Sequence, residues 1–150
     1  MTTENNEEND DSIELLKECD AGTKMAISSL DEVLEKVNDP HMKQILTESK
    51  GHHEKLQDEI FDQLMRKDSE EKDPNPLAKS MSWLKTNMKI GMDNSDATVA
   101  DLITDGCDMG IKSLHKYLNQ YKAANDDAKD FCHRLITIEE ELRKALQPYL

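Results

Sequence analysis

The sequence contains few of the residues from which several classes of protein are built. Aromatic residues make up 4% of the chain, and only five glycines occur, with no glycine-rich run. The phosphate-cradling loops of nucleotide-binding enzymes are therefore missing. No stretch approaches the roughly 18 apolar residues that a membrane span needs, and the opening MTTENNEEND lacks the basic and apolar regions of a signal peptide. We expect a cytoplasmic protein.

Positive charge and cysteine are also scarce. Nineteen lysines and arginines stand against 32 aspartates and glutamates, which gives a formal net charge of −13. Because nucleic-acid binding needs clustered positive charge, we expect no nucleic-acid partner, and the same acidity disfavours contact with a membrane. The three cysteines, Cys19, Cys107 and Cys132, follow no zinc-type spacing. They are expected to be reduced, buried thiols.

Apolar residues at helical spacing dominate the rest of the chain. Apolar residues make up 36% and charged residues 34%, proportions that suit amphipathic helices around a narrow core. We predict an all-α domain over residues 12–150, preceded by a disordered acidic tail over residues 1–11. Spacings of three and four predict long helices over residues 12–38, 40–67, 97–123 and 128–147, with a shorter one over 77–92.

The connections between these helices predict how they pack. Asn38-Asp39-Pro40 and Asn125-Asp126-Asp127 are short links, so each joins two helices into an antiparallel hairpin. The connection over residues 68–95 holds a charged linker with two prolines, followed by the shorter helix. This connection is long enough to return along a bundle of about 40 Å. We therefore predict a four-helix bundle of two hairpins with one long crossover.

One six-residue stretch occurs twice in nearly the same form. Residues 19–24 read CDAGTK and residues 107–112 read CDMGIK, each in the first half of the first helix of its hairpin. This internal repeat predicts two related hairpins. We expect the aspartates of both copies to point toward the middle of the bundle, and the glycines to let the helices approach closely.

The repeat is accompanied by two further stretches that carry a family resemblance. Together with the NDPHMK turn and the amphipathic crossover helix that ends at Gly91, the repeat makes this sequence similar to a bacterial ferritin-like, rubrerythrin-related family of uncharacterised function. The resemblance covers roughly residues 12–147. It implies a crossover four-helix bundle whose midsection, in metal-binding relatives, holds two metal ions.

The ligand pattern of such a two-metal site is incomplete in this sequence. Bundles of this class take a Glu-x-x-His motif from each of two helices, and no histidine here follows a glutamate by three residues. Polar residues on or beside the predicted core stripes give a candidate metal cluster of Asp20, His52, Glu59, Asp108, His115 and either Glu139 or Glu140. Their oxygen and imidazole donors suit iron, manganese or zinc. The alternative is an internal hydrogen-bonded network, or side chains that reach solvent at the stripe edges.

The predicted crossover helix carries apolar residues on opposite sides. Five leucine and methionine residues share one face, whereas Trp83 and Ile90 project from nearly the opposite side. Because tryptophan is enriched at protein interfaces, we expect Trp83 and Ile90 to form a homodimer contact.

No catalytic residue or organic cofactor is predicted. The one neighbouring thiol and imidazole, Cys132-His133, point in different directions on a helix. These features favour a ferritin-like bundle that is not an enzyme, has an incomplete two-metal site, and acts by self-assembly or by binding a protein partner. The alternative is a protein that binds two iron or manganese ions and acts in metal handling or oxidative-stress defence.

Overall fold

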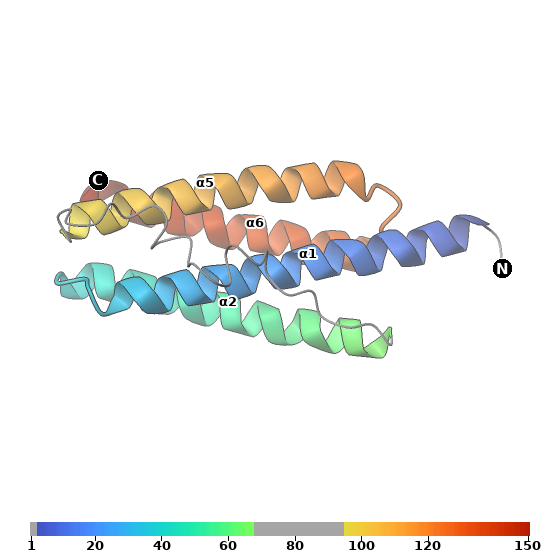
Figure 1. Cartoon of the computed structure of the whole chain (residues 1–150), viewed down its shortest axis with the longest axis horizontal. Helices are drawn as coiled ribbons and strands as arrows, with labels where there is room; N and C mark the ends of the chain where they lie inside the picture. The colour runs from blue at the N-terminus through green and yellow to red at the C-terminus, as the bar shows by residue number, and fades with distance from the viewer. Residues whose placement is uncertain (1–2, 68–94) are drawn as a thin grey trace.

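Four α-helices make up almost all of the residues that the computed structural model describes, 3–67 and 95–150 (Figure 1). They are α1 (Thr3–Leu34), α2 (Pro40–Arg66), α5 (Asp96–Gln120) and α6 (Asp126–Leu146), followed by a short 3-10 helix, η1 (Gln147–Tyr149). No strand occurs within the two described ranges, so the all-α prediction is confirmed. None of the described helices has a segment long and apolar enough to cross a membrane.

The helices form two antiparallel hairpins, α1 with α2 and α5 with α6 (Figure 1). Helix α5 begins at the end of the bundle where α2 begins, so residues 68–94 connect opposite ends of the bundle. The predicted four-helix bundle with one long crossover is confirmed. The predicted crossover helix lies outside the described residues, as do Trp83 and Ile90, whose interface therefore stays a prediction.

Side-chain caps explain where three of the helices begin. The carboxylate of Asp39 accepts the backbone N–H of Met42 at 2.8 Å, and Pro40 occupies the first helical position of α2. Asn125 caps α6 in the same way, and Ser95 caps α5. These residue types satisfy backbone donors that the first turn of a helix leaves without partners. The short polar links therefore fix the starts of the helices.

Each hairpin turn is held by a side chain from the other hairpin. The carboxylate of Asp96, at the start of α5, accepts the backbone N–H groups of residues 38 and 39, both at 2.9 Å. At the opposite end of the bundle, the carboxylate of Asp11 accepts the backbone N–H of Ala123 at 2.9 Å. These reciprocal contacts set the level of one hairpin against the other.

The start of α1 differs from the sequence prediction. We expected disorder through residue 11, but α1 begins at Thr3, and the side chains of residues 3–10 are exposed. Helix extension is favourable once Ser12 and the residues after it are docked, because each added residue then gains a backbone hydrogen bond. Acidic residues such as Glu4 also favour the positive end of the helix dipole. The acidic segment therefore extends α1.

The apolar core is divided into two clusters, one toward each end of the bundle. The cluster near the α1–α2 turn includes Leu30, Val33, Leu46, Ile103 and Leu146. The cluster near the α5–α6 turn includes Leu15, Leu56, Ile60, Leu114 and Leu135. Burial of such side chains, at roughly 1.5–3 kcal/mol each, is the main favourable term in folding. The level between the two clusters is polar.

Candidate functional site

A layer of buried polar side chains lies midway along the bundle. Its members are Asp20 and Thr23 of α1, Ser49 and His53 of α2, and Glu139 of α6. On α2 the layer falls between Leu46 of one apolar cluster and Leu56 of the other, and on α6 it falls between Ile136 and Leu142. The sixth buried polar residue in the described ranges, Ser12, lies near the α5–α6 turn. The layer therefore places polar side chains of three helices in the bundle core, which is where bundles of the ferritin-like class build their metal sites.

His53 is completely buried, and both of its ring nitrogens are hydrogen-bonded. Nδ1 lies 2.7 Å from the backbone carbonyl oxygen of Ser49, and Nε2 lies 2.8 Å from Oε1 of Glu139 on α6. A carbonyl oxygen can only accept, so Nδ1 must carry a proton and donate it. The contact between Nε2 and Oε1 then requires one further proton, on the imidazole or on the carboxyl group. The pair therefore shares one proton and has no net charge.

Asp20 is the other buried acid of the layer. Its carboxylate is completely buried and lies 3.0 Å from Nζ of Lys24, one turn later on α1. The side chain of Lys24 is 22% exposed, so its stem extends from the layer toward the surface. Thr23 donates its hydroxyl proton to the backbone carbonyl oxygen of Asp20 at 2.8 Å. The buried carboxylate is thus compensated by a cation of its own helix.

Cys107 of α5 adjoins the layer. Burial raises the pKa of its thiol far above the ordinary value, and the neighbouring carboxylate of Glu139 raises it further. The group is therefore a thiol at neutral pH, whereas a metal ligand would have to be a thiolate.

The structure brings only two of the sequence-predicted site residues into the layer, Asp20 and Glu139. His52 was placed on the core stripe of α2, but it is exposed and its neighbour His53 faces inward. The two positions differ by one residue, which turns the side chain by about 100° on a helix. The histidine that faces the buried layer is therefore His53.

The remaining predicted site residues lie at the surface. Asp108 was expected to point into the bundle, but its side chain is 52% exposed and pairs with Arg143 at 2.8 Å. His115 is exposed, as is Glu140, and Glu59 is half-buried beside Arg134. The difference between the two repeat aspartates follows from packing. Helix α1 packs against α2, α5 and α6, which cover both flanks of its stripe, whereas α5 packs chiefly against α6 and α1.

The two repeat glycines are not required for close helix contact, contrary to the sequence prediction. A Cβ atom added at Gly22 would lie 3.6 Å from Cδ2 of Leu135, and one added at Gly110 would lie 3.9 Å from Cδ of Glu139. Both distances are ordinary van der Waals contacts. Each position therefore has room for a methyl group.

The residues of the layer do not fit a two-metal site as they are arranged. In residues 3–67 and 95–150, no three His, Cys, Asp or Glu side chains are grouped so that they could hold a metal ion. The Glu-x-x-His pattern is split between two helices: Lys50 precedes His53 by three residues, and Leu142 follows Glu139 by three. Lys50 pairs with Asp31 and Glu54. Neither His53 nor Glu139 therefore belongs to a Glu-x-x-His motif, and the two side chains bind each other.

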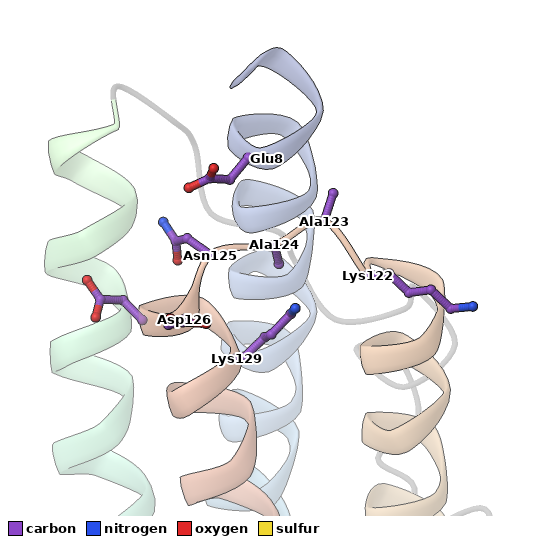
Figure 2. A pocket seen from close by; sticks show the side chains of 8 residues that line it. Glu8, Lys122, Ala123, Ala124, Asn125, Asp126 and Lys129 are labelled. Atoms are coloured by element: carbon purple, nitrogen blue, oxygen red, sulfur yellow. The ribbon is translucent and has the colours of Figure 1, made fainter. Parts of the chain in front are cut away.

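A hollow of about 490 Å³ lies at the end of the bundle, beside the α5–α6 turn (Figure 2). Its lining comes from Glu8 of α1 and from residues 122–127 and Lys129. Lysines and carboxylates are mixed in this lining, so it favours neither sign of charge. The hollow holds none of the sequence-predicted site residues.

Comparison with known proteins supports the fold. No model of a known protein family matches the sequence, and no curated protein is significantly similar to it. The structure is similar to that of a dodecameric thioferritin, a bacterioferritin-related protein from Bacteroides fragilis, with a TM-score of 0.73. The two chains are 12% identical, and the match covers 94% of this chain and 84% of that one. The chain therefore has the ferritin-like four-helix bundle fold.

Proposed function

We propose that this protein is a ferritin-like bundle whose mid-bundle level is occupied by a hydrogen-bonded histidine–glutamate pair instead of two metal ions. In this proposal the protein is not an enzyme and acts by self-assembly or by binding a protein partner. The observation that carries the proposal is the direct contact of 2.8 Å between Nε2 of His53 and Oε1 of Glu139. Nε2 of His53 and Oε1 of Glu139 are therefore already hydrogen-bonded to each other.

The residues around this pair support the same proposal. Lys50 and Leu142 stand where complete Glu-x-x-His motifs would supply a carboxylate and an imidazole. A lysine introduces positive charge, and a leucine offers no donor atom. The buried carboxylate of Asp20 is compensated by Lys24. Charge balance in the layer is therefore met by protein groups.

Self-assembly is supported by the fold comparison, because the similar protein from Bacteroides fragilis is a dodecamer. We propose a cytoplasmic homo-oligomer, with a dimer contact through Trp83 and Ile90. Cys19, Cys107 and Cys132 form no disulfide bond with one another in the structure, and reduced thiols are typical of proteins in a reducing compartment.

A second candidate function is a two-metal protein in metal handling or oxidative-stress defence, with iron or manganese as the ion. One observation favours it: Asp20, His53 and Glu139 bring oxygen and imidazole donors from three helices to one level of the bundle. These donor types suit both ions.

Metal content separates the two candidates. Full-length protein, purified without chelators and incubated with ferrous or manganous ion, should retain far less than one metal per chain by elemental analysis. Retention of about two ions per chain, the number in complete sites of this class, would overturn the first proposal if it were lost in His53→Ala and kept in the matched control His52→Ala.

The mass in solution tests the assembly part of the proposal. Light scattering should give a multiple of the chain mass for the wild type, and Trp83→Ala should shift that mass toward the monomer. An unchanged mass in Trp83→Ala would show that the oligomer forms through another surface, and a monomeric wild type would remove self-assembly altogether.

A further inference from the structure

Helices α1 and α6 run parallel (Figure 1), and two contacts define their register. The backbone N–H of Asn125 donates to Oγ of Ser12 at 2.8 Å, and these residues are 113 positions apart. Further along the same helices, Gly22 faces Leu135 at the same separation. That register also places Cys19 directly opposite Cys132.

The two thiols are neighbours and are shielded from water. A side-chain hydrogen bond with Cys132 is the largest cause of the raised pKa of Cys19, and the thiol of Cys132 donates to the backbone carbonyl oxygen of Leu114 at 3.7 Å. Both cysteines are 0% exposed and belong to the apolar cluster near the α5–α6 turn. The two cysteines are therefore neighbours in an apolar setting.

From this geometry we infer that Cys19 and Cys132 are a redox-active pair that closes to a disulfide between the two hairpins when a small, uncharged hydroperoxide oxidises it. The inference is independent of the proposed function, because it concerns the apolar cluster and not the polar layer.

The reaction consumes one peroxide for each pair. One cysteine sulfur attacks a peroxide oxygen, the O–O bond breaks, and a sulfenic acid and one water molecule form. The second sulfur then attacks the sulfenyl sulfur, the S–O bond breaks, and the hydroxyl group leaves as a second water molecule with the proton of the second thiol. Two thiols are oxidised to a disulfide, and hydrogen peroxide is reduced to two water molecules.

Burial determines which oxidants can reach the pair and how fast they react. The hydrogen bond with Cys132 and burial together raise the pKa of Cys19 well above its ordinary value, so the reactive thiolate is scarce. We expect slow oxidation by hydrogen peroxide and exclusion of bulky disulfides such as oxidised glutathione. A bond between α1 and α6 would close a long loop and restrict the unfolded chain.

The internal repeat supplies a matched control for this inference. Cys107 occupies the position in the second copy that Cys19 occupies in the first, and it too is buried. Its neighbour is the carboxylate of Glu139 and not a second thiol. Cys107 should therefore have no partner for an intramolecular disulfide.

The test uses full-length protein exposed to hydrogen peroxide, followed by alkylation of remaining thiols in denaturant and mass spectrometry. The wild type should lose two of its three thiols, and peptide mapping should find Cys19 joined to Cys132. Cys107→Ala should lose both of its remaining thiols in the same way. Cys19→Ala should form no intramolecular disulfide, and a thiol reductant should restore the wild type.

Two results would overturn the inference. One is persistence of all three thiols in folded wild-type protein after long exposure to peroxide. The other is oxidation of Cys19 and Cys132 to separate acids without a bond between them. Because both results are measured on the wild-type protein, the test remains valid even if an alanine variant fails to fold. Oxidised wild type should also unfold at a higher denaturant concentration than its reduced form.

Discussion

The two hairpins share a plan of construction but bury polar groups unequally. Four of the buried polar side chains in the middle layer come from the first hairpin, whereas the second contributes only Glu139. The contrast is greatest within the repeat: Asp20 is completely buried beside Lys24, while Asp108 is exposed beside Arg143. Nearly identical local sequences therefore have different environments, because α1 is covered on both flanks and α5 is not.

The largest expected effect concerns the histidine that the first hairpin places in the core. Replacement of His53 by alanine would leave the carboxyl group of Glu139 buried without its partner and would create a cavity. We expect His53→Ala to lower the free energy of unfolding by about 3–5 kcal/mol. The exposed neighbour gives the control: His52→Ala should change it by less than about 0.5 kcal/mol. Urea denaturation measures both, and equal losses would contradict the assignment of His53 to the core.

The second prediction compares the two repeat aspartates directly. Asp20→Ala removes a buried charged partner of Lys24 and should lower the free energy of unfolding by about 1–3 kcal/mol. Asp108→Ala removes an exposed ion pair and should leave stability unchanged within error. A similar loss in both variants would contradict the difference in burial between Asp20 and Asp108.

The smallest expected effects are at the repeat glycines, where the two hairpins should behave in the same way. Both positions are helical and have room for a methyl group. Gly22→Ala and Gly110→Ala should therefore each raise the free energy of unfolding by about 0.5–1 kcal/mol, since alanine loses less backbone entropy in a helix. Destabilisation by Gly22→Ala alone would reveal tighter packing of α1 than the distances indicate.

Most of the fold could be predicted from local sequence signals. Asp39-Pro40 and Asn125 mark helix starts through hydrogen-bonding and backbone chemistry that act within one turn. The length of the segment over residues 68–95 restricts the topology because it must reach across the bundle. The start of α1 was predicted too late because composition indicates only whether a segment folds by itself. A docked helix can extend such a segment without burying it.

The candidate site was harder to predict, because it depends on rotations of single residues. Buried positions of α2 include Leu46, Ser49, His53 and Leu56, and a stripe through His52 has the same spacings of three and four. Periodicity alone cannot choose between adjacent histidines. The environment of Asp108 depends on which helices pack against α5, which no local signal contains. The contact with Glu139 identifies His53 as the inward-facing histidine, and that contact depends on how α6 packs against α2.

The most direct test of a hydrogen-bonded His53–Glu139 pair in place of metal ions is the nitrogen NMR spectrum of the His53 ring, recorded with and without manganous ion. We expect a protonated Nδ1 that exchanges slowly with water, and ring signals that keep their intensity as manganese is added, because Nε2 is bound to Glu139. Broadening of the His53 ring signals at one or two equivalents of manganese, stronger than the broadening of the exposed His52, would contradict this prediction. That result would show that the layer is a metal site.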